Sequence, residues 1–416
     1  MNIAIIGGGI AGLTAAHFLR RQHQVTLLER SQRVGGNAYT IDTKRGDLVD
    51  IAVAAFGKAG YKNFYRLLDS LGIHPSISPG SFMSCHDLDT GKGIYLTASP
   101  AGLLAQRLAV LRPSTLRGLF GLPLGLGRLF RMREAGKLEG ITLDEALSRV
   151  PEMHGTARLL FLCALCLLSS MSCSEVLDSP AAFFVGKLAT HHDVISPKAL
   201  WSVRCVKGGT RRYVDALTAG FRDRVELGAR IRTVLRREDG VDLVMEDGAR
   251  RAFDEVVFAT NADQALALLA EPTDRERTIL GAWRYKDGRV VVHTDVSSFP
   301  PRPLMQAYTF LYRELGKGRF DTSVNGSLWY EPGVRRDCEY VSSQHPNFPI
   351  AAETIEHDCV LRTPIFDFAA YKTIRELPSL NGVRHTWYCG SHFGHGLHED
   401  AVTSAMAIAR GLGVAV

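Results

Sequence analysis

The chain has 416 residues, 46% hydrophobic and 22% charged, which is ordinary for a globular protein large enough to form two domains. The formal net charge of +6 is modest and no lysine- or arginine-rich block occurs, so no nucleic-acid partner is expected. No apolar run approaches the roughly 18 residues that a membrane span requires.

The first apolar run starts at residue 2, so we expect no secretory leader and a cytoplasmic protein with reduced thiols. Two cysteines, Cys163 and Cys166, lie in the apolar, helix-like run Leu159–Leu168. This context predicts buried small hydrophobic side chains rather than a redox pair or a metal site.

The beginning of the chain has the order of a dinucleotide-binding fingerprint. The apolar run Asn2–Ile6 predicts a buried parallel strand, and the glycine-rich stretch Gly7–Gly12 follows at once. Leu13–Arg21 has helical spacing, and Gln24–Leu28 predicts a second strand that ends at an acid. Strand, glycine turn, helix, strand and acid in this order predict a dinucleotide site.

The residues of this fingerprint have distinct physical roles. Gly7 permits the tight turn, Gly9 lets the backbone approach a pyrophosphate, and Gly12 lets helix and strand pack closely. Free N–H groups at the helix start would hold the diphosphate. Glu29 would bind the ribose hydroxyls and repel a 2′-phosphate, so NADP is not expected. The predicted nucleotide-binding residues of this stretch are Gly7, Gly9, Ile10, Ala11, Gly12 and Glu29.

A second glycine pair follows in Arg33-Val34-Gly35-Gly36-Asn37. Glu-x(3)-Arg-x-Gly-Gly after the fingerprint resembles FAD enzymes of the amine oxidase type, in which this pair lies along the flavin's phosphates. The resemblance implies an α/β fold with a Rossmann-like FAD-binding domain built from discontinuous segments, plus an α+β substrate domain. No Cys or His stands where covalent attachment can be argued, so the implied FAD is non-covalent. Implied cofactor residues here are Arg30, Gly35, Gly36 and Asn37.

Later segments extend the resemblance over nearly the whole chain. They resemble most a bacterial subgroup of predicted flavin-containing amine oxidoreductases. Four motifs carry this resemblance: Lys-Gly-Gly-Thr-Arg-Arg-Tyr-Val from Lys207, Ala-Thr-Asn-Ala-Asp-Gln-Ala-Leu from Ala259, His-Thr-Asp from His293, and Cys-Gly from Cys389 with Gly-Leu-His-Glu-Asp after it. By resemblance, the backbone of Ile231 pairs with the adenine, and a helix starting near Glu399 points its N–H groups at the flavin. The cofactor residues implied by these segments are Ile231, Thr260, Gly390, Ser391, His398 and Val402.

The resemblance assigns residues 1–76, 201–264 and 382–416 to the FAD-binding domain. It assigns residues 77–200 and 265–381 to the substrate domain. The first of these ranges is expected to be largely helical, and the second to consist, after a first helix, of strands and loops. Phe310, Trp329 and Tyr330 are expected to form walls of the substrate pocket. Periodicity predicts helices over Tyr61–Leu71 and from Asp263 to Leu269. Expected strands are Arg232–Arg237, Val241–Met245, Phe253–Ala259 and Arg289–Asp295.

Between residues 103 and 133, leucines alternate with arginines and no acid occurs before Glu134. Such a segment suits peripheral contact with an anionic membrane, or a carboxylate-bearing lipid. The alternative is helices packed on the core with arginines reaching to solvent. Prolines and glycines are expected to break the stretch into short helices at best (Pro113, Gly121, Pro123, Gly125 and Gly127).

The resemblance also suggests catalytic candidates. Leu397 stands where amine oxidases carry one of the two aromatic rings beside the flavin. A leucine at this position weakens the case for an amine substrate. Arg289 aligns with the family's lysine near flavin N5, where it would stabilise a reduced flavin or bind a carboxylate; a surface ion pair is the alternative. His395 or His398 is a candidate for proton transfer. Glycines interrupt the run from His392 to Asp400, so no metal is expected.

These features predict an FAD-dependent oxidoreductase that removes a hydride, at flavin N5, from a largely apolar substrate such as an unsaturated fatty-acyl chain. Three alternatives stay open: a redox-neutral double-bond isomerase, an amine oxidase, and a non-catalytic flavin-binding partner of a lipid-modifying enzyme. We expect the protein in the cytoplasm, with contact to the inner membrane face through 103–133 as a further option. The oligomeric state is not predicted.

Overall fold

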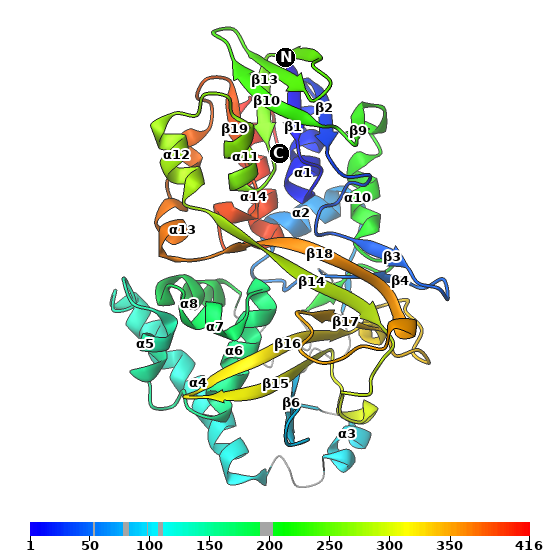
Figure 1. Cartoon of the computed structure of the whole chain (residues 1–416), viewed down its shortest axis with the longest axis vertical. Helices are drawn as coiled ribbons and strands as arrows, with labels where there is room; N and C mark the ends of the chain where they lie inside the picture. The colour runs from blue at the N-terminus through cyan, green and yellow to red at the C-terminus, as the bar shows by residue number, and fades with distance from the viewer. Residues whose placement is uncertain (53–54, 78–82, 98, 107–110, 192–202) are drawn as a thin grey trace.

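The computed structural model describes residues 1–52, 55–77, 83–97, 99–106, 111–191 and 203–416. Two parts are stacked along the long axis of the molecule (Figure 1). The upper part contains a parallel sheet with its helices and both marked chain ends, and the lower part contains a larger sheet flanked by helices. The predicted α/β class with a second, α+β part is confirmed.

The parallel sheet has five strands in the order β19-β13-β1-β2-β9. Ile3 and Ile5 of the central β1 point into one apolar cluster, and Ala4 and Ile6 point into another. Both faces are therefore buried, which explains the continuous apolar runs in the sequence. The strands are β1 (Asn2–Ile6), β2 (Gln24–Glu29), β9 (Val225–Leu227), β13 (Glu255–Phe258) and β19 (Thr386–Tyr388).

Helices pack along this sheet and join distant parts of the chain. α1 (Ile10–Leu19) packs against α14 (His398–Gly411), so the first helix of the chain touches the last. The remaining elements of this part are α2 (Lys62–Ser70), α10 (Arg211–Thr218), α11 (Ala262–Leu268), and the two-stranded pairs β3 (Thr40–Asp42) with β4 (Leu48–Asp50) and β5 (Ser76–Ile77) with β8 (Arg204–Cys205).

One expected strand, Phe253–Ala259, is divided between two sheets, one of which is a three-stranded antiparallel sheet. β10 (Ile231–Arg236), β11 (Val241–Met245) and β12 (Arg250–Phe253) form this sheet, and β13 belongs to the parallel sheet. The predicted strand Phe253–Ala259 is therefore two strands. The chain changes sheet at Asp254, whose backbone N–H donates to the carbonyl of Asn2 at 2.8 Å.

The second sheet has seven strands in the order β18-β14-β17-β16-β15-β6-β7. β14 begins at Arg284 rather than at Arg289, because it pairs with β18 along its whole length. The strands are β6 (Met83–Asp87), β7 (Gly93–Tyr95), β14 (Arg284–His293), β15 (Tyr308–Gly316), β16 (Arg319–Ser327), β17 (Val341–Gln344) and β18 (Ile355–Ile365).

The expectation of strands and loops alone after the first helix of 265–381 is wrong, because two further helices occur, α12 (Asp274–Gly281) and α13 (Phe368–Thr373). The start of α12 had a readable signal. The Thr273 hydroxyl accepts from the N–H of Glu276, and the Glu276 carboxylate accepts from that of Thr273. This is a capping box, Thr-x-x-Glu.

The helical part also differs from expectation in one respect. α4 (Pro113–Glu134) is one continuous helix through Pro123. Its glycines face the chain that leads into α6: a Cβ on Gly118 would lie 2.3 Å from the Thr156 Cβ, and one on Gly121 2.8 Å from a backbone oxygen. Glycine here permits close packing rather than breaking the helix. The neighbouring helices are α3 (Pro100–Ala105), α5 (Leu143–Ser148), α6 (Thr156–Ser169), α7 (Cys173–Leu177) and α8 (Ala181–Thr190).

Cys163 and Cys166 are buried on α6 with free thiols, so the prediction of small core residues is confirmed. No helix in the described part of the chain is long and apolar enough to cross a bilayer.

The strands of the two large sheets fall on opposite sides of the predicted domain division. The limit at residue 76 falls inside β5, and the limit between 200 and 201 lies outside the described residues. The exact domain limits therefore stay a prediction.

Candidate active site

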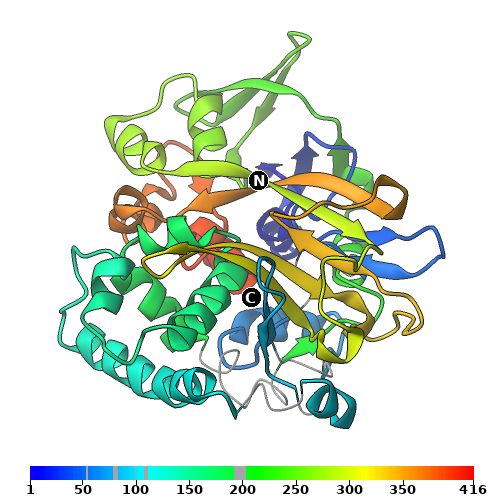
Figure 2. The ribbon, with the colours of Figure 1, turned by 60° about the horizontal axis from the view of Figure 1, so that its bottom comes forward.

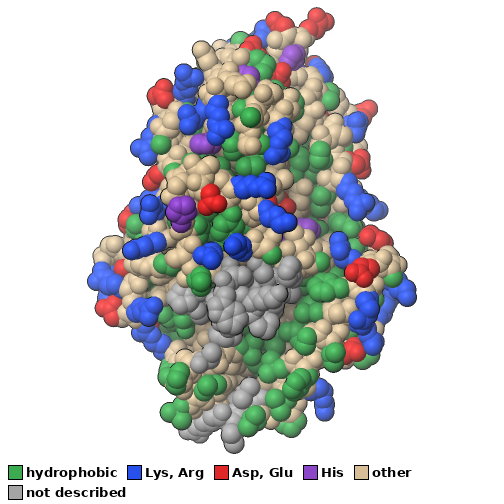
Figure 3. Space-filling model, turned by 180° about the vertical axis from the view of Figure 1, so that it is seen from behind, with side chains coloured by type: hydrophobic (Ala, Val, Ile, Leu, Met, Phe, Trp, Pro, Cys, Tyr) green, Lys and Arg blue, Asp and Glu red, His purple; other side chains and the backbone are tan. Residues whose placement is uncertain are grey.

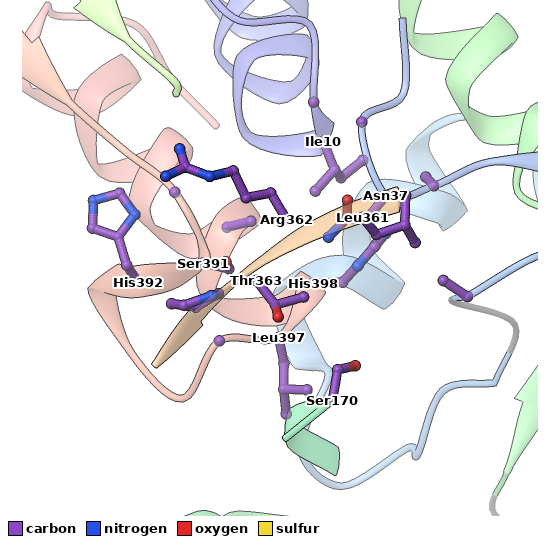
Figure 4. A pocket seen from close by; sticks show the side chains of 18 of the residues that line it. Ile10, Asn37, Ser170, Leu361, Arg362, Thr363, Ser391, His392, Leu397 and His398 are labelled. Carbon is purple, nitrogen blue, oxygen red and sulfur yellow. The ribbon is translucent and has the colours of Figure 1, made fainter. Parts of the chain in front are cut away.

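A cavity of about 950 Å³ lies between the parallel sheet and the second sheet. Its walls come from the glycine turn after β1, the start of α14, strands β14 and β18, and helices α4 and α6. In Figure 4, Ile10 and Asn37 reach the cavity from the glycine turns, while Leu397 and His398 face it from the C-terminal segment. Segments that are far apart in the sequence thus line the same cavity.

The first glycine turn leaves open space at the cavity. A Cβ on Gly9 would meet nothing within 4 Å, whereas one on Gly7 would lie 2.7 Å from the Ala259 oxygen. Gly9 precedes α1 without any side-chain cap, so the first N–H groups of the helix have no partner within it. Gly7, Gly9, Ile10 and Ala11, which the sequence assigned to the nucleotide, line the cavity. This cradle fits a diphosphate.

The second glycine pair is attached directly to the first. The Gly35 N–H donates to the Gly8 carbonyl at 2.7 Å, and a Cβ on Gly36 would lie 3.1 Å from the Gly9 Cα. Because both turns approach so closely, any side chain on Gly36 would press on the cradle. Gly35, Gly36 and Asn37 all line the cavity.

The acid at the end of β2 is fixed in place. The Glu29 carboxylate accepts from the backbone N–H of Gly8 at 2.7 Å and of Ser31 at 2.8 Å. Glu29, Arg30 and Ile231 line the same end of the cavity, together with Arg230. Their chemistry fits the ribose and adenine of a dinucleotide.

The C-terminal segment supplies the opposite wall. Thr260, Gly390, Ser391 and His398 line the cavity. Gly390 has φ near +158° and donates its N–H to the Ser404 hydroxyl at 3.1 Å, which holds the turn against α14.

His398 begins α14 and is buried. Its Nε2 lies 3.0 Å from the Tyr213 hydroxyl, with the rings of Phe56 and Phe64 beside it. Burial lowers the pKa of His398 to about 4, so the ring is neutral near pH 7. A neutral ring anchored on Tyr213 positions the helix start.

Two ionisable groups, the buried Lys187 and the half-buried Asp400, hold the loop that leads into α14. Lys187 donates from Nζ to the carbonyl of His395 at 2.7 Å, and the Asp400 carboxylate accepts from the Leu397 N–H at 2.9 Å. Burial lowers the pKa of Lys187 to about 7 and raises that of Asp400 to about 6. Leu397 and His398 are thereby fixed at the cavity wall.

The start of α14 is also tied to α2. The Glu399 carboxylate accepts from the backbone N–H groups of Asn63 and Phe64, each at 2.9 Å. These are first-turn N–H groups of α2, whose N-cap Tyr61 provides no side-chain acceptor. Glu399 therefore caps α2 from another helix.

The structure places Arg289, predicted beside the flavin, outside the cavity. Its guanidinium pairs with the Asp358 carboxylate at 2.7 Å, its side chain is 53% exposed, and the pair raises its pKa. Successive strand residues point to opposite faces, so the neighbours Gly288 and Val290 line the cavity instead. Arg289 thus forms the surface ion pair that the sequence left open as the alternative to a role beside the flavin.

Three other predicted site residues lie behind the wall. His395 is not a lining residue, and Ala401 rather than Val402 lines the cavity, since Val402 points into the core. Gly12 also has a packing role only: a Cβ there would lie 1.9 Å from the Gly7 oxygen.

The three expected pocket walls lie elsewhere. Phe310 is in the core, Trp329 lies under Arg302, and Tyr330 lines a second, much smaller cavity.

The part of the cavity that is lined by α4 and α6, here called its lower half, is largely apolar. α4 contributes Leu122 and Leu126, and α6 contributes the largest share of this wall, ending near Ser170. Figure 4 shows Leu361 of β18 and Leu397 among the side chains that line the cavity. The α6 lining residues are Leu160, Phe161, Ala164, Leu167, Leu168 and Ser169.

Several lining residues were missed by sequence reasoning. Leu361, Arg362 and Thr363 of β18 belong to no quoted motif. Neither do Gln344, the last residue of β17, and His345, which follows it. The i, i+4 spacing of Leu122 and Leu126 was readable, but spacing alone does not say what a helix face contacts.

No group of three His, Cys, Asp or Glu side chains suited to a metal ion occurs among the described residues. His392, which lines the cavity, packs against Trp283 with ring centroids 5.4 Å apart. Its pKa is lowered to about 3 by burial.

Comparison with known proteins places this geometry in a family. The model of flavin containing amine oxidoreductases matches residues 10–284. Flavin-containing amine oxidase A of Bos taurus is 39% identical over 74 residues, which are 17% of this chain and 14% of that protein. The alignment thus spans about a seventh of that relative's length.

Solved structures match over the whole chain at low identity. A CLA-producing fatty acid isomerase from P. acnes has a TM-score of 0.68 at 18% identity, covering 98% of each chain. Wild-type putrescine oxidase bound to putrescine has a TM-score of 0.72 at 14% identity, covering 99% of each chain. These likenesses show the fold. With the glycine cradle and the family match, they lead to one conclusion: the chain belongs to the flavin containing amine oxidoreductase family, whose cofactor, FAD, fits the upper half of the cavity.

Proposed function

We propose that the protein is an FAD-dependent oxidoreductase whose substrate is largely apolar, such as an unsaturated fatty-acyl chain. When bound, FAD supplies a hydride acceptor. The protein's residues supply binding, orientation and exclusion of water. The observation that supports this substrate class best is the hydrocarbon wall of the cavity's lower half, made by α4 and α6.

The charges on the cavity wall support the same proposal. Among the described lining residues, the carboxylates are Glu29 and Glu246. Glu29 is held by two backbone N–H groups, and Glu246 lies 3.8 Å from Arg230 at the nucleotide end. A cationic amine in the lower half would therefore find no described carboxylate on the wall, and burying an unpaired ammonium is costly.

Leu397 supports an apolar substrate in the same way. Its side chain faces the cavity (Figure 4). A leucine offers dispersion contacts to a carbon chain but no aromatic face for a cation. Held by Asp400 and by the Lys187–His395 contact, this loop keeps one hydrophobic surface at the place of reaction.

Anaerobic reduction of the flavin tests the substrate class. Purified yellow protein is mixed without oxygen with unsaturated fatty acids or, in parallel, with primary amines, and the flavin's visible absorbance is followed. We expect bleaching by the apolar substrate and none by amines. Bleaching by amines alone would contradict the proposal. A rearranged double bond without net bleaching would instead indicate the redox-neutral isomerase.

Substitutions on α4 test the position of the substrate. Leu126→Gln changes the cavity wall, whereas Leu124→Gln on the same helix changes an exposed face. We expect the first to raise KM for the apolar substrate about tenfold, equivalent to about 1.4 kcal/mol of lost binding, with unchanged flavin content. The second should leave KM unchanged with detergent-dispersed substrate. Equal KM values for both variants would contradict the placement.

A further inference from the structure

The outer face of the segment that walls the cavity carries exposed hydrophobic side chains. Leu104 on α3 is 81% exposed, and Phe120 and Leu124 on α4 are 72% and 64% exposed. Leu103 and Leu111, near the ends of α3 and α4, are half exposed. Exposed apolar residues occur singly on most surfaces, but five within one short segment mark an interaction surface.

These side chains lie at one end of the molecule. α3 and α4 both lie at the lower end in Figure 1 and along the lower edge in Figure 2. Figure 3, which views the molecule from behind relative to Figure 1, also shows hydrophobic side chains gathered at this lower end. We call Leu103, Leu104, Leu111, Phe120 and Leu124 the apolar end patch.

Basic side chains continue the patch along α4. Arg117, Phe120, Leu124, Arg128 and Arg131 recur at intervals of three and four residues, so they share one exposed helix face. Arg128 pairs with Glu152 at 3.2 Å, while Arg117 and Arg131 make no ion pair with any residue that the structure describes. An apolar centre flanked by free arginines is complementary to acyl chains beneath anionic headgroups.

The same helix separates this face from the cavity. Leu122 and Leu126 of α4 line the cavity, while Phe120 and Leu124 face outward. The glycine row of α4 packs on the chain leading into α6, so α4 is a single, closely packed layer between the two apolar surfaces.

We propose that the apolar end patch docks on the surface of an anionic lipid bilayer, with Phe120 and Leu124 in the acyl boundary and Arg117 and Arg131 at the headgroups. The cavity lies behind α4, and the use of this docking is to hold its apolar wall close to the bilayer that carries an apolar substrate. This use rests on the proposed function, whereas the docking itself does not.

Vesicle flotation tests the docking without turnover. Full-length protein is mixed with vesicles of phosphatidylcholine alone or of phosphatidylcholine with phosphatidylglycerol, and the floated fraction is measured at low and high salt. We expect binding to the anionic vesicles, weakened by salt because exposed charges are screened. Phe120→Glu with Leu124→Glu should reduce binding at least about tenfold, equivalent to about 1.4 kcal/mol. The matched control, Val383→Glu, changes an exposed valine of the FAD-binding part and should bind as the parent does.

A second measurement keeps the proposal falsifiable if the double variant does not fold. In Phe120→Trp the added indole should shift its emission to the blue when anionic vesicles are present, and Val383→Trp should not. Equal flotation of the double variant and the parent would overturn the proposal. So would absence of vesicle binding together with a dimer that the double variant dissociates, since the patch would then be an interface between two copies. Failed flavin reduction with intact vesicle binding would count against the proposed function alone.

Discussion

At the scale of single residues, Gly9 offers the sharpest test of the cofactor site. A Cβ there meets open space and its φ of −72° suits any residue, so the fold tolerates a side chain that enters the diphosphate cradle. We expect Gly9→Glu to fold but to lose flavin at least about tenfold, a difference of about 1.4 kcal/mol. Flavin absorbance per protein measures this loss. Gly281→Glu, at an exposed glycine of α12, should keep full flavin, and full occupancy in Gly9→Glu would contradict the site.

His398 gives a pH-dependent test at the same scale. Its pKa in the folded protein is about 4, below the usual 6.5, because burial disfavours the charged ring. The unfolded chain therefore binds the proton more readily, and stability is lost as the pH falls from 6.5 towards 4, by roughly 3 kcal/mol for this group. Denaturant unfolding across this range should show the advantage of the parent over His398→Gln shrinking with falling pH. A difference that does not change with pH would contradict a buried, neutral His398 ring.

At the scale of elements, Glu399 links α14 to α2. Its carboxylate satisfies two first-turn N–H groups of a helix that lacks its own side-chain cap. Removing it with Glu399→Ala should lower the free energy of unfolding by about 1–2 kcal/mol, as loss of a cap does. Glu399→Gln keeps one acceptor oxygen and should lose less. Chemical denaturation measures both, and a Glu399→Ala variant as stable as the parent would contradict the cap.

Helix α4 shows why elements resist prediction from sequence. Pro123 and the glycines read as breaks, because a local pattern carries only local preferences. In the structure the glycines meet Thr156 and Glu152, residues that lie more than thirty positions away along the chain. Tertiary packing thus overrides propensity here. By contrast, the strand–turn–helix that contains Gly7 and Gly9 was predictable, since its residues are neighbours in sequence and each has a conformational requirement.

At the scale of the whole molecule, the family motifs identified residues around the cofactor half of the cavity. They identified none on the wall that α4 and α6 form. Ile231, the first residue of β10, and Ser391, close after β19, both line the cavity, and the resemblance assigned both to the cofactor. Arg289 was misplaced by one strand position, and in a strand that shift exchanges inside for outside. Residues such as His345 and Leu361 are set by the register of the second sheet, which no motif in the chain encodes.

The central position of β1 has a consequence for biogenesis. β1 is flanked by β13 on one side, which in turn needs β19, and the α1 face is completed only by α14. During synthesis β1 and its neighbour β2 therefore emerge long before β13 and α14, with apolar faces uncovered. Such non-local pairing folds slowly and exposes the nascent chain to aggregation. Protection by a chaperone during translation, or early capture of the nucleotide, would shorten that vulnerable interval.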